Sequence, residues 1–166
     1  NNYSSRSYFT ASVILWLAIL TPVNAQQVKQ EHVIRQYLLN HLPVENQNWE
    51  ISQNPVNGYI YFANSEGLVE YNGISSKLYT LPFKQGIRSV YANPSGIIFT
   101  GSFEDFGYWE DNGQGGLAYH SLARGIQVLK NDEIWNILEK DGVVYFQSFT
   151  SIYAFSKKGV QVIPGP

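Results

Sequence analysis

The chain has 166 residues, of which 14% are charged and 15% aromatic, a composition typical of a globular protein rich in strand formers rather than of a disordered chain. Its formal net charge of −2 gives no electrostatic reason to expect a nucleic-acid partner. The lack of cysteine excludes a disulfide framework, a thiol nucleophile and a cysteine-ligated metal site.

The first 25 residues have the pattern of a secretory signal peptide. Arg6 is the only charged residue before Lys29, the segment 11–20 is almost wholly apolar, and small residues precede a cleavage point after Ala25. The apolar run is shorter than the roughly 20 residues that a membrane-spanning helix needs, which favours a cleaved signal over an uncleaved anchor. We therefore expect a signal peptide at 1–25 and a mature chain in the periplasm or outside the cell.

Residues 26–47 form a lead-in segment. Apolar side chains recur at helical spacing between residues 33 and 42, and Pro43 would end such a helix. The pattern predicts a short helix before the first strand.

Three copies of one pattern follow the lead-in segment. Each copy has a turn that ends in glycine, an apolar strand, a short polar break and a second strand. Aligning Gly58, Gly96 and Gly142 gives steps of 38 and 46 residues. Repeats of about 40–50 residues made of short strands are typical of β-propeller blades. The sequence therefore predicts an all-β fold with blades at 48–81, 86–122 and 133–163.

Each repeat is predicted to contain four strands, because apolar runs alternate with turn residues. The predicted strands are 49–53, 59–63, 68–71, 76–81, 88–92, 97–100, 106–110, 117–121, 134–139, 143–147, 152–155 and 160–163. Between the first and second strands of a repeat, glycine follows Asn, Ser or Asp, which predicts a hairpin turn with positive φ at that glycine.

The second strands at 59–63 and 143–146 are apolar at every position. A sheet with one wet face would alternate, so this pattern favours blades packed on both faces. Three blades are too few for a closed ring, which typically has about four to eight. We therefore expect an incomplete ring from the front end of a longer protein, with an outer blade whose uncovered face promotes self-association.

Several segments resemble the two-component-regulator propeller family. They are 47–49, 58–64, 66–68 and 71–73 in the first repeat and 99–109 in the second, where a glycine precedes Glu-Asp-Phe-Gly-Tyr-Trp. The resemblance covers about 47–163. It implies the periplasmic sensor region of a membrane-spanning regulator of polysaccharide utilisation. Such regulators continue into further blades, a triple-tyrosine domain, a membrane helix, and a histidine kinase or helix-turn-helix output. Kinase and DNA-binding activity would not reside in this segment.

No catalytic or metal-binding constellation is evident. His32, His41 and His120 have no second ligand at helical or strand spacing, and 113–116 lacks the lysine of a phosphate loop. Glu104 and Asp105 are adjacent, and adjacent side chains of an extended chain point apart. We therefore expect a binding protein that is not an enzyme and has no cofactor.

Topology suggests where a ligand would bind. In consecutive antiparallel strands, the loops after each second strand and the links between repeats share one end. Aromatic rings with nearby amide, carboxylate and guanidinium groups suit sugars, because rings stack on C–H faces and polar groups bind hydroxyls. The candidate ligand-binding residues are Asn48, Trp49, Glu66, Arg88, Phe103, Glu104, Asp105, Trp135 and Asn136. The alternative is that the two tryptophans pack in the core and the loop charges are merely solvated.

The favoured interpretation is a propeller fragment that senses an oligosaccharide, with further blades, a triple-tyrosine domain and a second copy as partners. One alternative is a propeller glycoside hydrolase or lyase, which needs two carboxylates about 5–9.5 Å apart. Another is a scaffold propeller that binds protein through aromatic residues on its rim.

Overall fold

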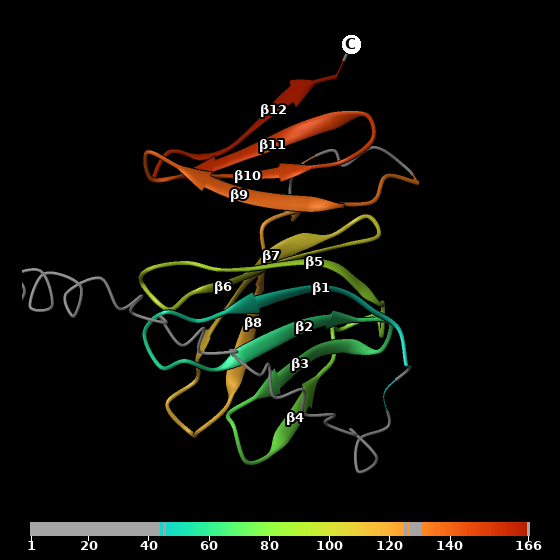
Figure 1. Cartoon of the computed structure of the whole chain (residues 1–166). Coiled ribbons are helices and arrows are strands. Elements are labelled where there is room, and N and C mark those ends of the chain that lie inside the picture. Colours follow the sequence, from blue (N-terminus) through green and yellow to red (C-terminus); the bar gives the residue numbers. More distant parts are fainter. Residues whose placement is uncertain (1–43, 45, 125, 127–130, 166) are drawn as a thin grey trace, which may run out of the picture. The chain divides into compact units, whose positions relative to one another are not determined.

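The computed structural model describes residues 44, 46–124, 126 and 131–165, all within the compact unit Leu38–Pro166 (Figure 1). The signal peptide predicted at 1–25 and the helix predicted before Pro43 lie outside the described residues. Over the described ranges the regular elements are all strands. No helix in this part of the chain is long and apolar enough to cross a membrane.

The strands form three four-stranded antiparallel sheets, and in each sheet the spatial order follows the chain order. The first sheet contains β1 (Asn48–Gln53), β2 (Ile60–Asn64), β3 (Gly67–Tyr71) and β4 (Ser76–Tyr79). The second contains β5 (Ile87–Ala92), β6 (Ile98–Ser102), β7 (Phe106–Asp111) and β8 (Leu117–Ser121). The third contains β9 (Asn136–Lys140), β10 (Val143–Gln147), β11 (Ser151–Ser156) and β12 (Gly159–Pro164). The all-β prediction is confirmed, and every predicted strand is present.

The hairpin turns form as their local sequence predicts. Gly58, Gly96 and Gly142 have φ values of 75°, 85° and 73°, a region that glycine enters without steric cost. The side-chain oxygens of Asn54 and Asn93 accept backbone N–H groups from within their turns at 2.9 and 3.0 Å. These local contacts fix the hairpin between the first and second strands of a sheet.

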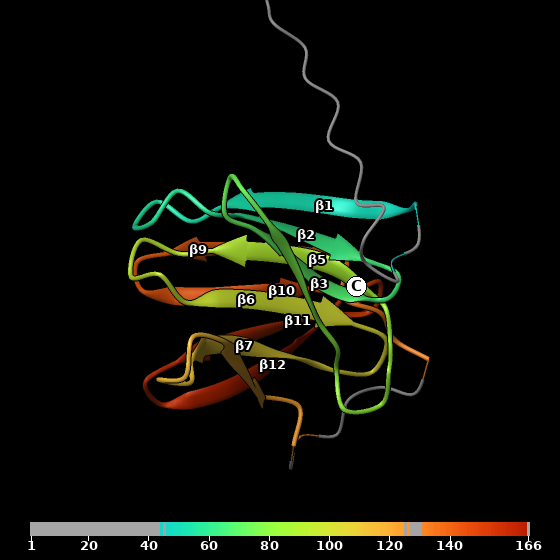
Figure 2. The same cartoon turned by 90° about the horizontal axis from the view of Figure 1, so that it is seen from below.

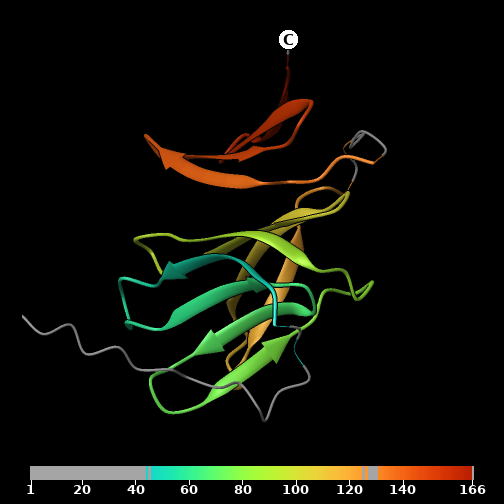
Figure 3. The same cartoon turned by 45° about the vertical axis from the view of Figure 1, so that its right-hand side comes forward.

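The first strands of the three sheets are neighbours. β1 contacts β5 and β5 contacts β9, so β5 lies between the other two (Figures 1 and 3). Seen from below, the three strands run in the same direction (Figure 2). Because each sheet is a simple meander, the three strand starts and the loops after β2, β6 and β10 gather at one end, as the sequence predicted.

The sheets pack face to face through two apolar cores. Tyr61 and Leu68 of the first sheet pack with Ile98 and Trp109 of the second. The opposite face of the second sheet uses the neighbouring residue Phe99, together with others, to pack against the third. Alternate side chains of the second sheet therefore enter different cores, and every residue of β6 is buried.

Side chains of β1 complete the hydrogen bonding of β5. The backbone N–H of Val90 donates to the Glu50 carboxylate at 2.7 Å, and that of Ala92 donates to the Ser52 hydroxyl at 2.9 Å. Since β5 is the edge of its sheet, these N–H groups have no strand partner on that side. Burial raises the pKa of Glu50, and the bond from Val90 opposes part of that rise.

Candidate functional site

A β-bulge occurs at the start of the first strand in the first and second sheets. Trp49 is an extra residue in β1, because the register with β2 shifts around it, and Arg88 is an extra residue in β5 for the same reason. In the third sheet, the N–H of Trp135 donates a hydrogen bond to the Gln147 carbonyl at 2.8 Å. Gln147 also lies opposite Asn136 in the register of β10 with β9. A bulge re-aims a side chain and is common beside functional sites. The first two sheets therefore present Trp49 and Arg88 from the same structural position, and Trp135 lies directly before β9 at the same end of the third sheet.

The side chains of Trp49, Arg88 and Trp135 converge. The Arg88 guanidinium carbon lies 4.3 Å from the centre of the Trp49 ring, within the range of a cation–π interaction. The Trp49 and Trp135 rings meet edge to face with centres 6.0 Å apart, and Phe149 adds a ring 5.4 Å from Trp135. We call Trp49, Arg88, Trp135 and Phe149 the bulge cluster. Trp49 is 38% exposed, Trp135 36% and Phe149 79%, so the rings remain open to a ligand.

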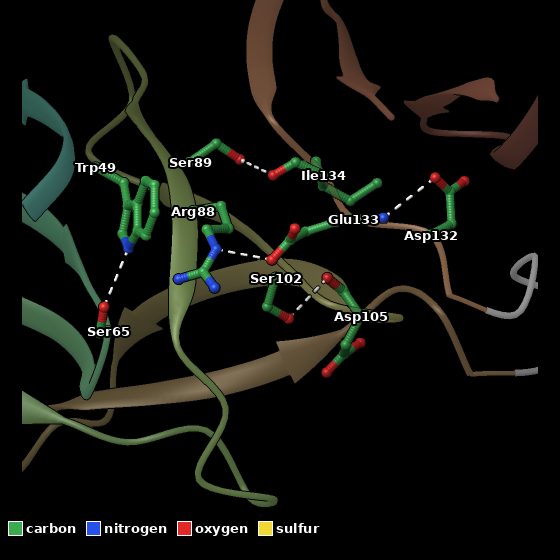
Figure 4. Close-up of polar contacts among 9 residues, drawn as sticks. All are labelled: Trp49, Ser65, Arg88, Ser89, Ser102, Asp105, Asp132, Glu133 and Ile134. Carbon is green, nitrogen blue, oxygen red and sulfur yellow. Dashed lines mark hydrogen bonds and ion pairs between the residues drawn. The ribbon is translucent and has the colours of Figure 1, made fainter. Parts of the chain in front are cut away.

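Hydrogen bonds hold two members of the bulge cluster in place. Arg88 Nε donates to Glu133 Oε1 at 2.7 Å, and both side chains are largely buried. Trp49 Nε1 donates to the Ser65 hydroxyl at 3.1 Å. Figure 4 shows Trp49 and Arg88 side by side, with Glu133 approaching Arg88 from the segment before Trp135. The orientation of the cluster is therefore set before any ligand arrives, which lowers the entropic cost of binding.

The segment that carries Glu133 is fixed by the loop after β6. Phe103 forms an isolated antiparallel bridge with Glu133, and the N–H of Glu104 donates to the Asp132 carbonyl at 2.8 Å. The Glu104 carboxylate in turn accepts the N–H of Asn131 at 2.7 Å. Glu104 has a φ of 53°, an uncommon conformation for a residue with a side chain, which these bonds stabilise.

Asp132 positions the loop that carries Phe149. Its buried carboxylate accepts the Thr150 hydroxyl at 2.9 Å and the Tyr153 hydroxyl at 3.1 Å. A buried carboxylate is tolerated when such donors satisfy it. The bond to Thr150 ties the 148–150 loop to the start of β9, and so keeps Phe149 beside Trp135.

The structure brings together three of the predicted site residues, Trp49, Arg88 and Trp135. Both tryptophans are partly exposed, and neither belongs to the two apolar cores. Phe103 lies at the edge of this region through its bridge to Glu133. The sequence carried a signal for this placement, since each of the three residues lies near the start of the first predicted strand of its repeat.

The other predicted residues make separate contacts. The side-chain oxygen of Asn48 accepts a bond from Asn64 at 2.8 Å. Glu66 is exposed in the loop after β2, and Asn136 is exposed at the start of β9. Asp105 accepts the Ser121 hydroxyl at 2.6 Å, and with Glu104 it lines a different cavity of about 320 Å³.

Sequence reasoning did not single out Glu133 or Ser65, and it did not name Phe149 as a candidate ligand-binding residue. Arg88 was expected to need a partner or a ligand, and Glu133 is that partner. No spacing rule connects two residues 45 positions apart, so only the fold reveals the pair.

Among residues 44, 46–124, 126 and 131–165, no group of three or more His, Asp or Glu side chains could hold a metal ion. A comparison of the chain with models of protein families and with curated proteins gives no match.

Proposed function

We propose that the three sheets are consecutive blades of a β-propeller and that the chain is the periplasmic ligand-sensing region of a membrane-bound signal-transduction regulator. Support for the blades comes from three four-stranded meanders in chain order whose first strands are adjacent. Support for the regulator comes from the resemblance of 47–163 to the two-component-regulator propeller family. In this proposal the partners are further blades, a triple-tyrosine domain and a second copy of the regulator.

The ligand that fits the bulge cluster best is an oligosaccharide. Trp49, Trp135 and Phe149 offer exposed aromatic surface on which the C–H face of a sugar ring can stack. Arg88 uses one of its several N–H donors on Glu133, so others can bind ring hydroxyls. The observation that carries the proposal is that two equivalent bulges and the segment before β9 bring Trp49, Arg88 and Trp135 to one place.

Binding without catalysis is the form of activity that we propose. Glu104 and Asp105, the adjacent carboxylates, are engaged by the Asn131 N–H and the Ser121 hydroxyl. In an intact dimeric regulator, an oligosaccharide that prefers one arrangement of the two copies would shift the population toward it and change the output.

The test is calorimetric titration of the protein with a panel of plant and host oligosaccharides. For a sugar that binds, Arg88→Ala should weaken affinity about tenfold, the loss expected for a partly desolvated charged donor. Lys158→Ala, in the exposed turn between β11 and β12 at the opposite end, is the matched control and should bind as wild type does. Wild-type heats in a folded Arg88→Ala variant would sink the proposal.

A further inference from the structure

A second cavity opens between the first and second sheets, opposite the bulge cluster. It lies at the end where the first strand of each sheet turns into the second strand. Its volume is about 320 Å³, within the usual size range of small-molecule sites. Three tyrosines line it, Tyr59, Tyr61 and Tyr79, together with the carboxylates of Glu70 and Asp111. We call this space the turn-end cavity.

Glu70 is the unusual residue of the turn-end cavity. It is only 8% exposed, and the Tyr61 hydroxyl donates to its carboxylate at 3.0 Å. A buried carboxylate normally has a cationic partner, because hydroxyl donors alone leave its charge uncompensated. Over the described ranges, Arg88 forms an ion pair with Glu133 and the His120 imidazole contacts Glu110, and neither contact involves Glu70.

Lys77 is the nearest candidate counter-charge, and its ammonium group is engaged elsewhere. In the register of β3 with β4, Lys77 lies directly opposite Glu70. Its Nζ nevertheless donates to the Gly115 carbonyl at 2.8 Å, in the turn between β7 and β8. Lys77 therefore links the first sheet to the second at the rim of the cavity rather than neutralising the carboxylate.

Tyr61 and Tyr79 are neutral hydroxyl donors at physiological pH, because each has a raised pKa. Burial, followed by the charge of Glu70, raises the pKa of Tyr79 to about 12 and raises that of Tyr61 as well. The lining therefore carries the negative charges of Glu70 and Asp111 against the single positive charge of Lys77. Aromatic rings combined with net negative charge favour cations.

We propose that the turn-end cavity binds a small organic ammonium ion, with the charged nitrogen next to Glu70 and the apolar groups against the tyrosines. A bare metal ion fits less well, because no set of three or more acidic or imidazole ligands occurs in the described part of the chain. This site is independent of the sugar site, since the two lie at opposite ends of the sheets.

The experiment is calorimetric titration of the full chain with choline chloride, compared with the uncharged isostere 3,3-dimethyl-1-butanol at matched ionic strength. Wild type should bind choline and show no comparable heat with the alcohol. Glu70→Gln keeps an acceptor for Tyr61 but removes the charge, and should weaken choline binding about tenfold. Glu139→Gln in the third sheet is the matched control and should bind choline as wild type does.

Lys77→Met should change choline affinity in the opposite direction to Glu70→Gln. The substitution does not disturb a buried group, because Lys77 is exposed. Removal of the competing ammonium at the rim should tighten choline binding by roughly two- to fivefold. Tightening in Lys77→Met together with weakening in Glu70→Gln supports the site. Equal heats from choline and the alcohol, or wild-type affinity in both variants, would overturn it.

Discussion

The second and third sheets are built from the same repeat but differ in burial. All five residues of β6 are buried, whereas the third sheet exposes Leu138, Ile152 and Val162. The second sheet also has Gly101 where a Cβ atom would overlap the side chain of Ile134. The third sheet has the exposed Gln147 at the corresponding place, five residues after the turn glycine. The strand pattern therefore specifies the sheet, while burial depends on whether a neighbour covers each face.

The largest change in the free energy of unfolding should come from substitutions in the core between the second and third sheets. Phe106 is fully buried, and its ring centre lies 4.7 Å from that of Phe146 and 4.9 Å from that of Tyr153. We expect Phe106→Ala to lower the free energy of unfolding by about 3–5 kcal/mol, from lost burial and the remaining cavity. Urea denaturation measures this change.

The comparison variant is Ile152→Ala, at a residue of the third sheet that is 37% exposed. It should cost about 1 kcal/mol or less, because the side chain already contacts solvent. Similar losses in the two variants would mean that the outer face of the third sheet is covered in solution, and the contrast between the sheets would fail.

A smaller, pH-dependent change in the free energy of unfolding should come from Glu50, where the first sheet meets the second. Burial raises the pKa of Glu50 above its usual value of 4.5, so the folded state holds this proton more tightly than the unfolded state. The resulting stability is present below pH 4.5 and is lost as the pH rises through the raised pKa. Glu50→Gln should therefore gain stability relative to wild type between pH 4 and pH 7. A difference between the two proteins that stays constant across this range would contradict the assignment.

The sequence was sufficient to predict the strands and hairpins, because these depend on local signals. Asn54 and Gly58 bring the first hairpin together from within five residues, and the repeats contain similar turns. It also placed Trp49, Arg88 and Trp135 at the same end of the sheets, since antiparallel order alone decides that.

The bulges and the partner of Arg88 could not be predicted in the same way. A bulge is a register shift against the partner strand, and the sequence of one strand does not reveal it. Glu133 meets Arg88 only because Phe103 bridges to the segment before β9. The exposure of the two tryptophans also depends on which faces the sheets cover, and a general preference for burying aromatic residues does not decide it.

Side chains from the starts of separate sheets meet in the bulge cluster, and exciton coupling in far-ultraviolet circular dichroism tests this convergence most directly. Trp49 and Trp135 come from the first and third sheets, and their ring centres are 6.0 Å apart, close enough for their transitions to couple. Trp49→Phe and Trp135→Phe should remove the same couplet, while Trp109→Phe, whose ring packs in the core with Tyr119, should retain it. Unrelated difference spectra for Trp49→Phe and Trp135→Phe would show that the two tryptophans do not meet.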